Sequence, residues 1–304
     1  MPATTGMIGT YRKFYEDKPD DGGEGGAEVW YHRTQNMVCV YMKGPGGAAY
    51  VRRDNPDEAF VWALFHPLRV AAGGESLDVP LGSLVILPPG DSSVALPEGG
   101  DVWIGFTSEA RDLLDRCPNK DEYQPRVDNI APIVPWPEPT GGYKLRVYNL
   151  DETKEHCYRH RTGMTRFQWP VGSAPRDATA MSPHHHEDFE QASLIHSGTQ
   201  VHHMRRNWSR NANEWMPDEH MVLAAPSVAI SKPPDIHTTQ AVSTGGPVGL
   251  IDFFAPPRWD FSNVADLVVN AAEYPMPSEE PQSYARSTSV YAANDPRSGT
   301  ERRP

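Results

Sequence analysis

The chain has few cysteines and no long hydrophobic run. Only three of its 304 residues are cysteine, Cys39, Cys117 and Cys157, and their wide spacing does not suit a disulfide framework. No apolar run approaches the length of a membrane span, and the first residues lack the pattern of a secretory signal. We therefore expect a protein of the reducing cytoplasm that does not enter a membrane.

Positive charge is also scarce. The chain has 28 lysines and arginines against 40 aspartates and glutamates, which gives a formal net charge of −12. This balance disfavours a general nucleic-acid-binding surface. Proline is abundant instead, at 30 residues, and so many prolines argue against long helices and for a loop-rich β protein.

Histidine is nearly absent from the first half of the chain. Only His32 and His66 lie within the first 150 residues, and the other ten lie between positions 156 and 237. This asymmetry predicts two modules with different chemistry.

The densest histidine cluster is 184–190, which reads His-His-His-Glu-Asp-Phe-Glu. If this segment is a strand, side chains two residues apart share a face, so His184, His186 and Glu190 point the same way. Two imidazoles and a carboxylate that converge on one point form a metal site. Asp188 has the same parity and is an alternative to Glu190, whereas His185 faces the other side.

His237 is the candidate for a fourth ligand. It follows an apolar stretch at 228–230 and the bend Pro233-Pro234. Prolines fix such a bend and cannot continue a central strand, so the bend can direct His237 back toward the first three residues.

The set His184, His186, Glu190 and His237 resembles the metal site of the cupin superfamily. The first motif of that family is His-x-His, three or four residues, Glu and then a glycine, which matches His184 to Glu190 followed by Gly198. Its second motif is a proline-containing turn followed by histidine. The usual glycine of the second motif is missing here, and the long stretch from Glu190 to His237 implies an inserted loop.

The first half resembles a second cupin barrel that lacks its metal. Residues 82–93 match the second motif: Gly82, five residues, Pro88-x-Gly90, two residues, and then the position expected to be histidine. That position is Ser93, and the first half has no His-x-His. The resemblance therefore implies an all-β fold of two jelly-roll barrels with few short helices.

The predicted organisation has five parts: an N-terminal arm at 1–27, a degenerate metal-free barrel at 28–116, a proline-rich linker at 117–142, a metal-binding barrel at 143–276 and a polar tail at 277–304. The short helix expected in the first half spans 109–116.

The resemblance implies one divalent metal per chain. Fe(II) is the first choice, with Mn(II), Ni(II) or Zn(II) as alternatives. The leading hypothesis is a non-haem dioxygenase that acts on a small, anionic organic molecule, with Glu190 able to act as a base. Two alternatives stay open. One is a redox-neutral isomerase or lyase that works through a metal-stabilised enolate, and the other is a non-catalytic metabolite-binding bicupin.

Substrate contacts are expected from the strand that precedes the metal motif. Arg166 and Gln168 share one face of it, and Phe167 and Trp169 share the other, so either face is a candidate for the pocket wall. An arginine beside the metal would select a carboxylate or phosphate, and Arg166 is the first choice for this role. We also expect a homodimer.

Overall fold

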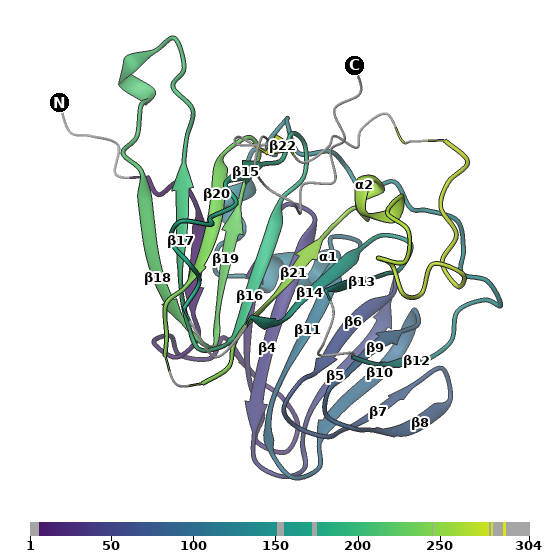
Figure 1. Ribbon diagram of the computed structural model, residues 1–304. Helices are drawn as coiled ribbons and strands as arrows, with labels where there is room; N and C mark the ends of the chain where they lie inside the picture. Colours follow the sequence, from purple (N-terminus) through teal and green to yellow (C-terminus); the bar gives the residue numbers. More distant parts are fainter. Residues whose placement is uncertain are drawn as a thin grey trace.

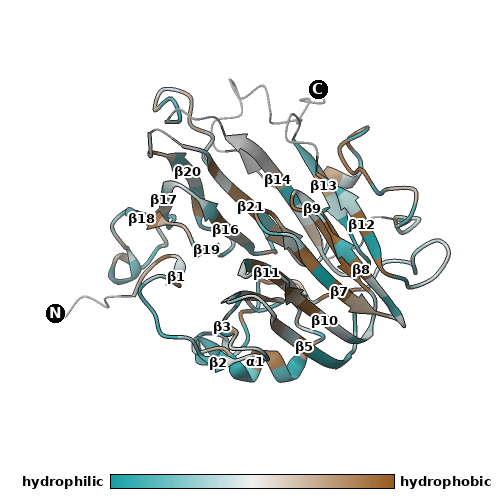
Figure 2. Cartoon of the chain, turned by 90° about the horizontal axis from the view of Figure 1, so that it is seen from below, coloured by the Kyte–Doolittle hydropathy of each residue, from teal (hydrophilic) through white to brown (hydrophobic). Residues whose placement is uncertain are grey.

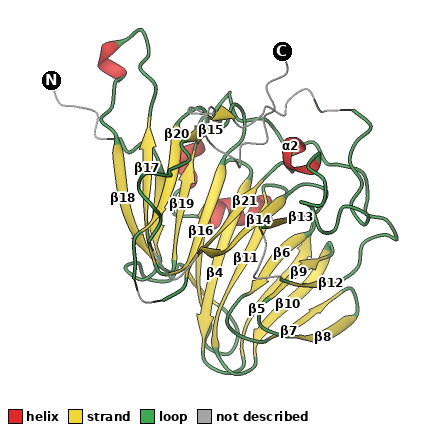
Figure 3. Ribbon diagram, viewed as in Figure 1, coloured by secondary structure: helices red, strands yellow, loops and turns green. Residues whose placement is uncertain are grey.

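Nearly every regular element of the protein is a β-strand, as a computed structural model shows (Figure 3). The structure describes residues 6–150, 155–171, 175–244, 246–279, 281 and 288–289, with backbone alone at 168–171 and 288–289. Four antiparallel sheets form two barrels, one rich in strands from the first half of the chain and one from the second half (Figure 1). The all-β, two-barrel prediction is therefore confirmed.

The first barrel has a seven-stranded sheet, in the order β12-β9-β6-β11-β4-β3-β2, and a four-stranded sheet, in the order β5-β10-β7-β8. Its strands are β2 (Asp21–Gly22), β3 (Glu28–Arg33), β4 (Met37–Gly44), β5 (Ala48–Asn55), β6 (Ala59–Ala63), β7 (Leu68–Ala72), β8 (Glu75–Val79), β9 (Ser83–Leu87), β10 (Gly90–Leu96), β11 (Gly100–Thr107) and β12 (Arg146–Asn149).

The second barrel has a six-stranded sheet, β1-β19-β16-β21-β14-β13, and a five-stranded sheet, β18-β17-β20-β15-β22. Its strands are β1 (Thr10–Lys13), β13 (His156–Arg159), β14 (Met164–Val171), β15 (His184–His185), β16 (Gln191–Ser197), β17 (Thr199–Arg205), β18 (Glu219–Ala224), β19 (Ser227–Ser231), β20 (Ile236–Ala241), β21 (Val248–Phe254) and β22 (Thr288–Ser289). The short helices are α1 (Arg111–Arg116), α2 (Trp259–Ser262) and the 3₁₀ turns η1 (Lys120–Tyr123) and η2 (Ala212–Glu214).

Four strands cross the domain boundaries expected from the sequence. β2 lies in the predicted arm and pairs with β3, and β22 lies in the predicted tail and pairs with β15. β1 lies in the predicted N-terminal arm but pairs with β19 of the second barrel. β12 lies just after the predicted linker but pairs with β9 of the first barrel. Thr10–Lys13 and Asp21–Gly22 of the predicted arm are therefore paired into sheets.

The inserted loop expected between Glu190 and His237 is largely regular structure. Most of it forms β17 and β18, which pair with each other from Thr199 to Ala224. Only the tip at 206–218 extends beyond the barrel, at the upper left of Figure 1. The long spacing therefore adds a hairpin to the barrel wall.

β4 shows how the sequence builds both barrels at once. Val38, Val40 and Met42 point into the apolar interior of the first barrel, whereas Cys39 and Tyr41 point the other way. Alternate residues of a strand lie on opposite faces, so a run that is apolar at every position is buried on both sides. In Figure 2, many of the hydrophobic (brown) segments lie on the strands of the sheets, for example on β21 and β10.

The two barrels differ in what fills them. The first barrel encloses one large apolar core, built from residues such as Val61, Val85 and Ile104. A second core lies between the barrels and joins Trp62 and Trp103 of the first to residues of the second. Among the described residues, the second barrel holds two small apolar clusters. A barrel interior fills with side chains unless a ligand takes the space, so the second barrel is the place to look for a site.

None of the described helices has the length and apolar composition needed to cross a membrane.

Candidate metal centre

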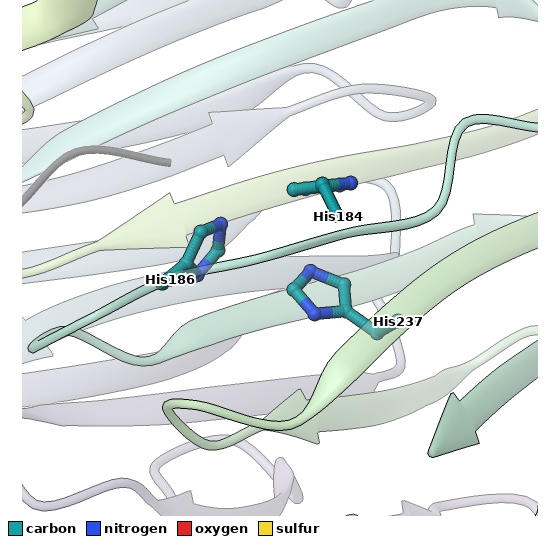
Figure 4. A group of neighbouring side chains, drawn as sticks. All are labelled: His184, His186 and His237. Atoms are coloured by element: carbon teal, nitrogen blue, oxygen red, sulfur yellow. The ribbon is translucent and has the colours of Figure 1, made fainter. Parts of the chain in front are cut away.

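Three histidines meet inside the second barrel. The ligand atoms of His184, His186 and His237 all lie within 4.8 Å of one another. His184 and His237 are direct partners in the pairing of β15 with β20, and His186 follows β15 by one residue. Figure 4 shows the three rings converging from these two segments. The sequence prediction placed all three in one site, and the structure brings them together.

The strand expected over 184–190 is much shorter in the structure. β15 ends at His185, and residues 186–190 form no strand. The parity argument that linked His184, His186 and Glu190 therefore does not apply to the whole segment. His185 turns to a different partner, since its Nε2 lies 2.8 Å from an oxygen of Glu187.

Hydrogen bonds fix which nitrogen each ring presents. The Nδ1 atom of His184 lies 2.9 Å from the carbonyl of Ser182, and that of His237 lies 3.3 Å from the carbonyl of Asp235. A carbonyl only accepts, so Nδ1 carries the proton in both rings and Nε2 keeps its lone pair. This arrangement of a ligand ring held by a carbonyl is typical of metal-bound histidine.

Several of these nitrogens are buried without a partner. Both ring nitrogens of His186 and Nε2 of His237 have no hydrogen bond within the described part of the chain. Leaving a buried polar atom unpaired costs about 1–3 kcal/mol, and native structures do so rarely. Three converging imidazoles, two of which have buried nitrogens without a partner among the described residues, suit a divalent transition metal, so the residues present fit such an ion.

The electrostatics keep the ligands neutral. Burial lowers the pKa of His186 well below its ordinary value, and neighbouring His237 and Arg258 lower it further. Burial likewise lowers the pKa of His237, with His184 as the next cause. A metal ligand must be the neutral imidazole, so the rings are ready for metal at neutral pH.

Aromatic packing and a buried guanidinium hold His186 in place. Its ring stacks on Phe189 at 4.2 Å with an interplanar angle of 21°. Arg258, which is 4% exposed, lies 5.0 Å from the Phe189 ring centre and 5.1 Å from that of Phe254. Asp260 accepts hydrogen bonds from Nε and Nη2 of Arg258. The sequence analysis did not select Arg258, although the Pro256-Pro257 turn before it was an available signal.

An ion pair supports the bend that carries His237. Asp235 is 2% exposed and accepts from Nε and Nη2 of Arg206 at 3.0 and 2.7 Å. A turn from Lys232 closes on the amide of Asp235 at 2.9 Å. Because Arg206 begins the hairpin tip, that tip is mechanically linked to the ligand bend.

No family model and no curated protein matches the sequence. Solved structures do match the fold. A variant of oxalate decarboxylase from Bacillus subtilis aligns with a TM-score of 0.52 and 16% identity, over 84% of this chain and 80% of that one. The chain has the bicupin fold.

Two further matches agree with this assignment. Oxalate decarboxylase of Lactobacillus farciminis in complex with formate has a TM-score of 0.51 and 15% identity, over 83% of this chain and 88% of that chain. A structure of oxalate decarboxylase that concerns substrate binding and a switch of reaction specificity has a TM-score of 0.51, 15% identity and coverage of 95% and 91%. The cupin resemblance found in the sequence is confirmed at the level of fold.

Glu190 is not part of the group that the three histidines form. It is buried, and its two carboxylate oxygens accept hydrogen bonds from the backbone amide of Gln35 and the hydroxyl of Tyr123, both at 2.7 Å. Burial raises its pKa, while these bonds oppose the rise. The group of converging ligand atoms includes neither Glu190 nor Asp188, so a metal role for either stays a prediction.

The predicted substrate residues lie on β14. Arg166 shares a face with Met164, which packs in an apolar cluster of the second barrel. Its guanidinium pairs with Glu155 and lies 5.2 Å from the ring centre of Phe261. The side chain of Gln168 lies outside the described residues, and both substrate roles stay predictions.

The first barrel offers no comparable group. Ser93 sits in β10 between Val51 and Ala71 of the neighbouring strands. Within the described ranges, the three histidines of the second barrel are the one set of three or more potential ligands that converge. The unequal histidine content of the two halves thus matches the location of the candidate centre.

Proposed function

We propose that this bicupin is a metal-dependent enzyme that acts on a small, anionic, chelating molecule in its second barrel. The observation that carries the proposal is the convergence of His184, His186 and His237, in which buried nitrogens of His186 and His237 have no hydrogen-bond partner among the described residues. The filled first barrel acts as a scaffold. Fe(II) is the first choice of metal, and Mn(II), Ni(II) or Zn(II) are the alternatives.

Three neutral imidazoles leave the charge of a divalent ion uncompensated. When bound, such an ion supplies Lewis acidity and a template for a chelating substrate. The protein as a whole has a charge of −12, which repels a free anion. The site must therefore attract the anion locally, and Arg258 beside the triad adds positive potential there.

Polar side chains line the barrel next to the triad. His202 on β17 is buried, with Nε2 free of hydrogen bonds among the described residues, and its charge affects the pKa of His237. Gln200, on the same face of β17, also has a buried amide nitrogen without a partner. Unpaired buried donors of this kind are suited to bind substrate oxygens, because a buried donor without a hydrogen bond costs free energy that a bound oxygen recovers.

The reaction we propose is oxygenation of the chelated substrate, as the leading hypothesis from the sequence. A redox-neutral reaction on the same anion is the alternative, and the fold matches favour a carboxylate as the anion because the proteins matched are oxalate decarboxylases. Metal-loaded protein should be offered oxalate and other small carboxylates while O₂ uptake and CO₂ release are recorded. Uptake of O₂ supports the oxygenase, and turnover without O₂ supports the alternative.

Binding measurements test what both proposed reactions require, which is that the anionic substrate binds at the metal. We expect small carboxylates to bind metal-loaded protein at least tenfold more tightly than metal-free protein, because a chelating anion gains the metal's charge. Isothermal titration calorimetry measures both constants. Equal affinity in the two forms would show that the ion is not where the anion binds.

A separate prediction concerns Arg166. An Arg166→Ala variant that retains its metal is expected to bind carboxylates roughly tenfold more weakly, which corresponds to the loss of about 1.4 kcal/mol of charge-assisted hydrogen bonding. Arg205→Ala is the matched control, because Arg205 pairs with Asp218 at an exposed position of the same barrel. Unchanged affinity in Arg166→Ala would assign Arg166 a purely structural role beside Glu155.

A further inference from the structure

Glu190 and Gln191 are adjacent in the sequence, and either could supply a fourth metal ligand. The start of β16 at Gln191 directs their side chains to different parts of the molecule. Ala192 and Leu194 pack in the core between the barrels. Residues alternate along a strand, so Gln191 and Ser193 face the interior of the second barrel. Glu190, which precedes the strand, reaches Gln35 of the first barrel. The side chain on the triad's side of the sheet is thus Gln191.

Gln191 and His186 share a neighbour, Phe254. The Cα of Gln191 is the direct partner of Phe254 in the pairing of β16 with β21. The Phe254 ring centre is 6.2 Å from that of His186. Cross-strand partners have Cβ atoms about 4.5–5.5 Å apart, so Gln191 and His186 approach the same residue, Phe254.

Hydrogen bonds fix the orientation of the Gln191 amide. Its Nε2 donates to Oδ1 of Asp252 at 2.9 Å and to Oγ of Ser193 at 3.1 Å. Ser193 in turn donates to the same Asp252 oxygen at 2.7 Å. Both amide hydrogens are therefore used, and Oε1 is the end of the side chain that remains to accept a bond. No described residue donates to that oxygen.

We propose that the fourth protein ligand of the metal is the amide oxygen of Gln191 and that Glu190 is not a ligand. This inference rests on the proposed three-histidine centre. A glutamine ligand makes the protein ligand set neutral, whereas a glutamate would cancel one of the ion's two charges. The neutral ligand set leaves the full charge of the ion available to an anionic substrate. It agrees with the finding that no described aspartate or glutamate belongs to the converging group.

The test compares substitutions at two adjacent positions. Gln191→Leu keeps the size of the side chain and removes the oxygen, so we expect Mn(II) or Co(II) to bind about tenfold more weakly, at the low end of the loss seen when groups around a metal are changed. Glu190→Gln should leave the dissociation constant within about twofold, because that carboxylate serves Gln35 and Tyr123 instead. Calorimetric titration with the metal alone gives both values.

A third variant keeps the test decisive if Gln191→Leu does not fold. Gln191→Glu should tighten metal binding about tenfold, because a carboxylate replaces a neutral oxygen next to a cation. The visible spectrum of the Co(II) form should change in both Gln191 variants and stay the same in Glu190→Gln.

The opposite pattern would overturn the inference: a large loss in Glu190→Gln with no change in either Gln191 variant. His186→Ala separates this failure from that of the proposed function. If His186→Ala loses metal while the Gln191 variants do not, only the fourth ligand is wrong. If His186→Ala binds metal normally, the centre itself is wrong.

Discussion

His186→Ala is expected to weaken divalent-metal binding by on the order of 100-fold or more and to abolish metal-dependent turnover. Changes to groups that merely support a ligand already cost about 10–100-fold, and His186 is itself one of three converging ligands. The substitution also removes a buried ring that stacks on Phe189. Elemental analysis after dialysis against trace metal measures the effect.

His185→Ala is the matched control for this prediction. His185 is the adjacent residue of the same histidine run, and its ring pairs with Glu187 instead of joining the cluster. Its metal content should equal that of the unmodified protein. Equal losses in both variants would mean that the run binds metal loosely as a polar segment, in the way that an exposed tag does.

The metal-free protein is expected to lose stability steeply as the pH falls from about 6.5 toward 5. Burial lowers the pKa of six buried histidines: to about 3 in His32, His196 and His202, to about 4 in His160, and well below the ordinary value in His186 and His237. The pKa of the more exposed His203 is lowered as well. The unfolded chain takes up these protons below about pH 6.5 and the folded chain does not, so acid favours unfolding.

Three buried carboxyls act in the opposite direction. Burial raises the pKa of Glu58 to about 7 and also raises those of Glu190 and Asp252. The folded state therefore holds up to three protons that the unfolded state has released. Six histidines less three carboxyls leave a net uptake of three protons on unfolding, or about 4 kcal/mol per pH unit. Domains are stable by only about 5–15 kcal/mol, so this slope is large.

Thermal unfolding of the chelator-treated protein from pH 7.5 to pH 5 measures this slope. The midpoint should fall by roughly 10 °C per pH unit below pH 6.5. His32→Gln replaces one buried titratable ring of β3, which is not part of the converging histidine group, by a neutral amide and should make the slope shallower by about one proton. A midpoint that stays constant or rises on acidification would contradict the account of the buried histidines.

The histidine cluster could be predicted from the sequence because its motifs are local. His184 and His186 are two residues apart, and His237 follows a proline bend, so both motifs can be recognised without knowledge of the tertiary structure. The contrast between the barrels was also predictable, since Ser93 stands where a ligand was expected and the first half has little histidine.

The distinction between Glu190 and Gln191 was not predictable. It depends on where β15 ends and β16 begins, and a shift of one residue moves every following side chain to the other face. The segment 186–190 leaves the strand, which breaks the alternation that the parity argument used. Element boundaries are the least certain part of any sequence-based prediction.

The exchange of strands between the barrels was equally hidden. β1, from the start of the chain, pairs with β19 of the second barrel, and β12, from the second half, pairs with β9 of the first barrel. Pairing partners of that kind are set by the tertiary arrangement, and no local pattern in Thr10–Lys13 or Arg146–Asn149 encodes them. Arg258 was missed for the same reason, because its approach to Phe189 joins distant segments.

Anomalous diffraction from crystals of metal-loaded protein, combined with elemental analysis of the same sample, tests the central claim most directly. The account predicts one equivalent of metal per chain, with one anomalous peak in the second barrel between the rings of His184, His186 and His237. Two tightly bound equivalents, or a single peak elsewhere with none at these rings, would contradict it.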